Sequence, residues 1–322
     1  MTDAGISRLK HFSISFLAIP LGLVGFTLAL KKADVILNLP FQGYNYLLYA
    51  TILIFILITG LYFLKLLKFP DEVRKEINHP IKINFFPIFA KIFLILSIIY
   101  LDMNLLLARN LWIIGVILQF IFSIAITSMW LRHSKFEFEH LNPSWFIPIV
   151  GNVIIPIAGV QLGYIELSWF FFSIGIIMWA VLFTIVFNRI IFHHPIADKL
   201  IPTFFILFAP PAIAFIAYVK LVGEIDPFAR ILYYTSLFLL LLVFAQVTLF
   251  SKIKFYLSWW AYSFPMAAIT IATLLMYHET KIQFFEILSI LLLTILTSII
   301  VYLVYKTSKE IMRKGLCIPE ED

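Results

Sequence analysis

Ten long apolar runs, separated by short polar segments, account for most of this 322-residue chain. A helix needs about 20 apolar residues to cross a bilayer. Charged residues make up 13% of the chain and mean hydropathy is +1.00, whereas charged residues reach about 25% in soluble domains. We therefore predict an all-α integral membrane protein whose ten crossings are residues 12–30, 46–66, 85–101, 110–131, 144–162, 167–189, 201–219, 230–250, 258–277 and 284–305.

The prolines are distributed unevenly among these runs. Every proline inside a run lies in an odd-numbered one, and the even-numbered runs contain none. Proline deletes a backbone hydrogen bond and kinks the helix, and the freed carbonyl must be satisfied by protein or water rather than by lipid. We expect the odd helices to form an inner ring around a central hole, with the even helices outside. The prolines that we expect to kink the inner ring are Pro20, Pro87, Pro156, Pro210 and Pro265.

Basic residues indicate the orientation in the membrane. Lys and Arg number 17 in the loops and tails on the side of the termini and six on the opposite side, and Lys91 lies within a run. Cytoplasmic loops carry the excess of basic residues in membrane proteins. We therefore expect a multi-pass protein of the cell (inner) membrane with both termini cytoplasmic. The spread of these charges over short loops explains the basic pI of about 9.2 without a nucleic-acid partner.

The short loops predict a single membrane domain. We expect a cytoplasmic N-terminal segment over residues 1–11, a ten-helix domain over 12–305 and a cytoplasmic tail over 306–322. A weak repeat consists of a proline-bearing run, a short loop and a proline-free run. It predicts five helical hairpins around one axis, although two-fold repeats are the commoner arrangement in transporters.

No enzyme motif emerges, and we predict no cofactor and no metal site. All 18 carboxylates lie in tails, in loops or at the edges of runs. Coupled transporters usually carry an ionisable relay within the membrane, so this distribution favours passive conduction or uncoupled uniport. Two explanations remain for Lys91: a positive charge that faces the pore and attracts anions, or a lysine that snorkels to the cytoplasmic interface. The candidate pore-lining residues are Leu17, Lys91, Asn152, Phe208 and Ser263.

Four motifs occur in one order along the runs. They are Ile19–Leu23 (IPLGL), His79–Phe86 (HPIKINFF), Ala209-Pro210, and Trp259–Met266 (WWAYSFPM), of which the last is the most specific. In these motifs the chain resembles the slow-type anion channels of plant guard cells and their bacterial relatives, the tellurite-resistance TehA proteins. It departs from the family at Leu17-Ala18, where Phe-Gly is frequent.

The resemblance implies a homotrimer in which each protomer has its own pore, closed midway by a phenylalanine of the ninth helix. That residue corresponds to Phe264, which a purely structural interpretation would make one packed aromatic among 34 phenylalanines. The resemblance implies conduction of small inorganic anions such as chloride and nitrate. A carrier for C4-dicarboxylates or tellurite-type oxyanions is the alternative, and a membrane sensor or scaffold is a third hypothesis.

Overall fold

The computed structural model describes residues 8–38, 43–132, 136–250 and 252–318. Over these residues the chain is helical and contains no strand. The first part of the expected N-terminal segment, residues 1–7, and the last part of the tail, residues 319–322, lie outside the described residues. In the described part, nine helices are long and apolar enough to cross a membrane. The all-α membrane fold predicted from the sequence is confirmed.

Each inner segment changes helix type along its length. It begins as a 3-10 helix and continues as an α-helix, and a proline lies next to the junction or in the first turn of the α-helical part. Proline suits this position because the first turn of an α-helix has no intrahelical use for its amide hydrogen. The pairs are η1 (Ile14–Leu17) with α2 (Ala18–Leu37), η2 (Lys82–Phe85) with α5 (Ile88–Tyr100), η5 (Gly151–Ile154) with α8 (Ile155–Gly159), η6 (Asp198–Leu207) with α10 (Ala209–Val222), and η7 (Leu257–Tyr262) with α13 (Ser263–Thr280).

The inner segments close into a ring. Helix α2 packs against α5, α5 against α8, α8 against α10, α10 against α13, and α13 against α2. Each segment also packs against the long helix that follows it in the chain, which gives the five hairpins expected from the weak repeat. These following helices are α3 (Tyr44–Lys68), α6 (Leu105–Arg132), α9 (Ile165–Phe192), α11 (Pro227–Phe244) and α14 (Gln283–Met312).

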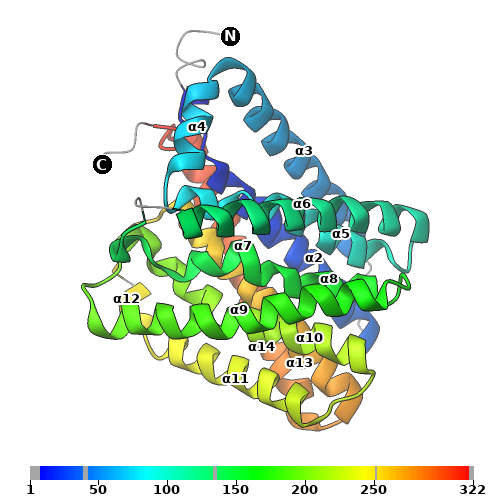
Figure 1. The fold of residues 1–322 in the computed structure, drawn as a ribbon. Helices are drawn as coiled ribbons and strands as arrows, with labels where there is room; N and C mark the ends of the chain where they lie inside the picture. Colours follow the sequence, from blue (N-terminus) through cyan, green and yellow to red (C-terminus); the bar gives the residue numbers. More distant parts are fainter. Residues whose placement is uncertain (1–7, 39–42, 133–135, 251, 319–322) are drawn as a thin grey trace.

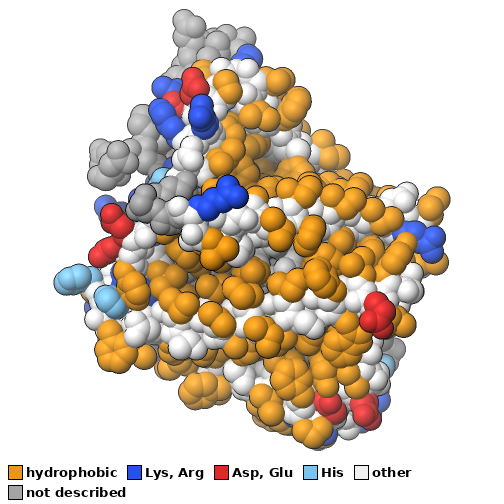
Figure 2. Space-filling view, in the orientation of Figure 1, with side chains coloured by type: hydrophobic (Ala, Val, Ile, Leu, Met, Phe, Trp, Pro, Cys, Tyr) orange, Lys and Arg blue, Asp and Glu red, His pale blue; other side chains and the backbone are white. Residues whose placement is uncertain are grey.

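Burial separates the inner helices from the outer ones. In an apolar stretch of 18 residues from each crossing, between 72% and 83% of the residues are buried in the four long inner segments, against 22% to 39% in the five outer helices. The division into kinked inner and proline-free outer helices, predicted from the prolines, is thus confirmed. Figure 2 shows the consequence, a broad hydrophobic surface with charged side chains gathered toward its ends.

Outer helices satisfy backbone carbonyls at the breaks. In α6, Gln119 Nε2 donates to the carbonyl of Pro148 at 2.8 Å, and Trp112 Nε1 donates to that of Ile155 at 3.0 Å. Both donors are buried. An unsatisfied carbonyl in hydrocarbon costs several kcal/mol, so these contacts make the kinked fifth segment compatible with the membrane interior.

The fifth predicted crossing, residues 144–162, differs from a regular helix. Its backbone consists of four consecutive short helices, η4 (Pro143–Trp145), α7 (Phe146–Val150), η5 and α8, so Pro143–Gly159 is shorter than the other crossings. Two prolines, Pro148 and Pro156, interrupt it. The ten predicted crossings therefore correspond to nine long helices and this broken segment.

A short amphipathic helix, α4 (Pro70–Asn78), lies between α3 and η2 and was not expected from the apolar runs. Figure 1 shows it beside both chain termini, with α3 leading to it at an angle from the rest of the bundle. A second short helix, α12 (Val247–Phe250), follows α11, and η3 (Phe138–His140) follows α6. These short helices were not expected from the apolar runs, and of the three, α4 is the one rich in charged residues.

Candidate functional site

Two cavities lie inside the ring of inner segments. The large cavity has a volume of about 210 Å³ and the small cavity about 70 Å³. Their lining residues come from the five inner segments and the loop residues next to them, and none comes from a long outer helix. This is the central hole that the proline pattern predicted, divided into two parts.

The two cavities follow one another along the ring axis. In α2 the small cavity is lined by Ala18 and Leu21, and the large cavity by residues further along, from Gly25 onward. The other four segments have the same order, so all five run in the same direction. Ile154, Ile213 and Phe264 line both cavities.

Phe264 is the largest of the three shared residues, and it lies at the start of α13. Its side chain is half-buried, whereas the adjacent Ser263 and Pro265 are buried. On the neighbouring inner helix α2, Gly25 leaves room for the aromatic side chain, because a Cβ atom at this glycine would lie 3.1 Å from Phe264 Cδ2. The ring of Phe264 therefore lies at the boundary of the cavities rather than within a close-packed core.

Lys91 is the one charged side chain that lines the small cavity in the described part of the chain. It is 4% exposed, and its Nζ donates to the backbone carbonyl of Ile147 at 2.6 Å. Gly151 allows this approach, since a Cβ atom there would collide with Lys91 Nζ. The side chain reaches the broken fifth segment, and Lys91 lines the small cavity.

Helix N-termini add to the positive potential of the small cavity. The first turns of α2, α5, α10 and α13, helices of 13 to 20 residues, contribute to its wall. The N-terminus of an α-helix carries about +0.5 elementary charge. Together with Lys91, and with no carboxylate among the described lining residues, these helix ends favour an anion over a cation.

The far end of the large cavity has a charged rim. Lys32 and Lys220 line it together with His278 and Glu279, which are joined by a 3.0 Å contact. The neighbouring Lys31 does not line the cavity; its Nζ donates to the carbonyl of Ile99 at 2.6 Å and lies 3.1 Å from Asp102 Oδ2. The deeper wall of the large cavity is apolar.

The structure places the other sequence-selected residues as follows. Pro210 and Pro265 line the small cavity, whereas Pro20, Pro87 and Pro156 lie at the other three junctions. Neither cavity is lined by four of the candidate pore-lining residues, all buried among the described helices, namely Leu17, Asn152, Phe208 and Ser263.

Two of those four residues make identifiable contacts. Asn152 Oδ1 lies 3.3 Å from Ser123 Oγ of α6, on the outer side of the fifth segment. The Ser263 hydroxyl donates to the carbonyl of Trp260 at 2.5 Å, next to Gly22 of α2. Asn152 thus contacts an outer helix, whereas the Ser263 hydroxyl bonds within its own segment.

Sequence reasoning did not select Gly25, Lys32 or Lys220. Gly25 lies two residues after the IPLGL motif, and the spacing of Gly22 and Gly25 on one face of α2 was the available signal. The two lysines were counted only as loop charges.

Comparisons with known proteins show to which family the chain belongs. The profile of the voltage-dependent anion channel family matches residues 11–308. Two S-type anion channels of Arabidopsis thaliana are 29% and 32% identical to the chain, over 87% and 83% of its length and 45% and 52% of theirs. The chain thus spans about half the length of these relatives.

A bacterial relative has a more similar length. The tellurite resistance protein TehA homolog of Haemophilus influenzae is 27% identical over 91% of this chain and 90% of its own length. The family resemblance noted in the sequence motifs is therefore confirmed across the membrane domain. The chain belongs to the voltage-dependent anion channel family.

Proposed function

We propose that this protein is a passive anion channel that conducts small monovalent anions such as chloride and nitrate, and that Phe264 is the gate. The observation that carries the proposal is the position of Phe264 on both central cavities. A phenyl ring across an apolar passage excludes water and ions together, because a dehydrated ion faces a steep barrier. Ile154 and Ile213 complete this apolar constriction.

The charges support conduction of anions. The small cavity has Lys91 and four helix N-termini in its wall, and the rim of the large cavity has Lys32 and Lys220. No carboxylate among the described lining residues lies in the interior, where a coupled transporter would hold its coupling ion. This arrangement supports uncoupled flow. The names of the two Arabidopsis relatives, S-type anion channels, agree with it.

The alternative function is transport of C4-dicarboxylates or tellurite-type oxyanions, and the TehA homolog relative favours it. Planar-bilayer recording of the purified protein in chloride, nitrate and malate separates the two. A channel gives discrete single-channel steps with chloride and nitrate. A flux that saturates, exchanges malate and shows no steps would instead establish a carrier.

We further propose that the protein assembles as a homotrimer, as the family resemblance implies. The outer helices present apolar side chains over most of their length; α3, for example, exposes Tyr46, Leu53 and Leu57. Such a surface suits lipid and contacts between protomers alike. Each protomer encloses its own cavities, so assembly is not needed to form the passage.

We also propose that both termini are cytoplasmic. On this orientation, single cysteines at Asn38, Glu166 and Glu224, placed in a background with Cys317 changed to serine, react with a membrane-impermeant maleimide added outside the cell. These positions lie at the ends of hairpins opposite the termini, and Lys75→Cys serves as the inner-side control. If Lys75→Cys is labelled and two of the other three positions are protected, the proposed orientation is wrong and the termini lie outside.

Replacing Lys91 with glutamine is expected to reduce anion conductance or the preference for anions over cations. The charge lies in a buried site where screening by salt is weak, while the glutamine amide retains a donor for the Ile147 carbonyl. Bilayer recording at low ionic strength measures the effect, and Lys199→Gln, in an exposed position before the seventh crossing, is the control. If Lys91→Gln has the same conductance and selectivity as Lys199→Gln, Lys91 does not contribute to the conduction path.

A further inference from the structure

A third cavity lies apart from the passage, at the end of the molecule where Figure 1 places α4 and the two termini. We call it the basic pocket. Its volume is about 170 Å³, and its wall combines residues before η1, the end of α3, α4, the segment between α4 and η2 with the first residue of η2, and Ile318 at the end of the described chain. Four lysines and two glutamates line it, so these residues give a net charge of +2 without its two histidines. The charged residues are Lys10, Lys65, Glu72, Lys75, Glu76 and Lys82.

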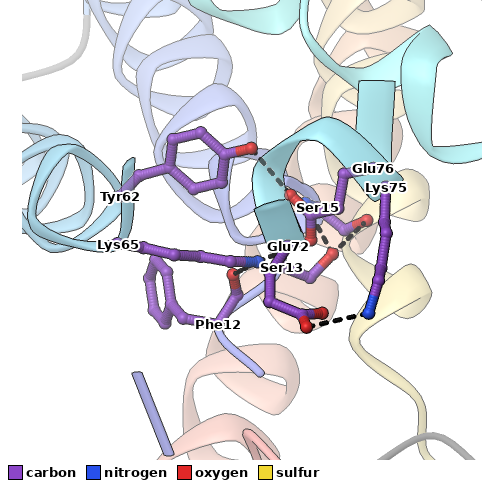
Figure 3. A network of polar contacts seen from close by, with 8 residues as sticks. All are labelled: Phe12, Ser13, Ser15, Tyr62, Lys65, Glu72, Lys75 and Glu76. Atoms are coloured by element: carbon purple, nitrogen blue, oxygen red, sulfur yellow. Dashed lines mark hydrogen bonds and ion pairs between the residues drawn. The ribbon is translucent and has the colours of Figure 1, made fainter. Parts of the chain in front are cut away.

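Both glutamates of the pocket are engaged by neighbouring side chains: Figure 3 shows the hydrogen bonds of Glu76 with Tyr62 and of Glu72 with Lys75. Glu76 Oε1 lies 3.1 Å from Lys65 Nζ, and Glu72 Oε1 lies 2.9 Å from Lys75 Nζ. The hydrogen bond from Lys75 lowers the pKa of the Glu72 carboxyl below its ordinary value. Glu72 therefore remains ionised at neutral pH, and the formal charges of the described lysines and glutamates of the pocket sum to +2.

A compact, strongly charged oxyanion matches this lining. Lysine ammonium groups bind phosphate as point charges. The pocket also contains His79, whose Nδ1 accepts from the backbone nitrogen atoms of Ile81 at 3.1 Å and Lys82 at 3.3 Å.

The position of the pocket also suits a phosphate group. Lys65 is in the last turn of α3, a helix that is apolar enough to cross the membrane, and α4 follows it directly. Basic pockets at the ends of membrane helices lie at the level of lipid headgroups. A free phosphate ion and the headgroup of an anionic lipid present the same chemistry at this level.

We propose that the basic pocket binds a phosphate group. Lys65 links the pocket to the beginning of the first inner segment, because its Nζ also donates to the carbonyl of Phe12 at 2.9 Å, and the next residue, Ser13, caps η1. The site is separate from the proposed passage, since none of its lining residues lines either central cavity.

Thermal unfolding of the purified protein in detergent tests the site. Inorganic phosphate is expected to raise the Tm above that in potassium chloride of the same ionic strength, because a ligand that binds the folded state stabilises it. The double variant Lys10→Gln/Lys75→Gln reduces the net charge of the pocket from +2 to zero and is expected to abolish this rise. Both lysines are substantially exposed, at 46% and 72%, so the Tm without phosphate should change little.

The variant Glu72→Gln provides the opposite test. It raises the net charge of the pocket to +3 and is expected to enlarge the phosphate-induced rise in Tm and to shift its midpoint to a lower phosphate concentration. A general loss of structure cannot produce this gain. If phosphate leaves the wild-type Tm unchanged, or if the rise is the same in wild type and both variants, the proposal is wrong.

Nanodiscs distinguish the source of the phosphate group. Wild-type protein is compared in phosphatidylcholine with and without phosphatidic acid. If lipid is the ligand, phosphatidic acid raises the Tm and removes the response to free phosphate, and Lys10→Gln/Lys75→Gln loses both effects. If free phosphate is the ligand, its response persists in both membranes. If neither phosphatidic acid in nanodiscs nor free phosphate in nanodiscs or detergent raises the Tm, the proposal is wrong, and the anion-channel assignment is unaffected.

Discussion

Replacing Phe264 with alanine is expected to raise the basal anion current about tenfold or more while the protein still folds. The ring lies at the boundary of the two central cavities, and its removal joins them into one passage in which an ion keeps part of its hydration shell. Gly25, which faces the ring, adds no side chain to refill the space. Chloride efflux from liposomes containing equal amounts of assembled protein measures the effect.

Two buried phenylalanines serve as controls. Phe215 lies in the inner helix α10 but packs against Tyr233 at 5.4 Å between ring centroids, away from both cavities. Phe172 is buried in the outer helix α9. Alanine at either position is expected to cost about 3–5 kcal/mol of stability by leaving a void and to leave the current unchanged. If Phe264→Ala behaves in the same way, the gate assignment fails.

Replacing Glu76 with glutamine is expected to destabilise the protein by about 3–5 kcal/mol, because it leaves a buried ammonium group without its counter-charge. Lys65 and Glu76 are only 2% and 7% exposed, and their charged atoms lie 3.1 Å apart. Lys65 also fixes the start of the first inner segment through the carbonyl of Phe12, as Figure 3 shows. Thermal or denaturant unfolding in detergent measures the loss.

Two matched variants identify the cause of this loss. Glu72→Gln breaks a more exposed pair on the same helix and is expected to cost no more than about 1 kcal/mol. The double variant Lys65→Met/Glu76→Gln removes both buried charges and is expected to recover most of the stability lost in Glu76→Gln. An equal loss in Glu72→Gln and Glu76→Gln, with no recovery in the double variant, would contradict the role of the buried pair.

The inner ring could be predicted because proline acts locally. Each of Pro20, Pro87, Pro156, Pro210 and Pro265 prevents a regular helix wherever the segment lies, and burial follows because lipid cannot satisfy the broken backbone. The outer helices could be predicted because their runs contain no proline, so an unbroken helix satisfies its own backbone and can face lipid. The prediction of the fifth crossing was less accurate. Two prolines within nine residues divide this segment into shorter helices than its hydropathy suggests.

The lining of the passage could not be predicted in the same way. The direction of a side chain depends on the rotation of each helix, which hydropathy alone does not determine when a helix is apolar all round. Asn152 was selected for its polarity, but its amide oxygen lies next to Ser123 of α6. Gly25 was overlooked because the closeness of the Phe264 ring depends on how α2 and α13 meet. The basic pocket joins segments that are distant in sequence.

The reversal potential of purified Phe264→Ala protein in a planar bilayer, with a potassium chloride gradient across the membrane, tests the central claim most directly. We expect the variant to give a current that reverses close to the chloride equilibrium potential, in contrast to a nearly silent wild type. The positive potential of Lys91 and the helix N-termini around the small cavity is the physical reason. A reversal potential close to that of potassium, or no current above wild type from well-folded protein, would contradict the account.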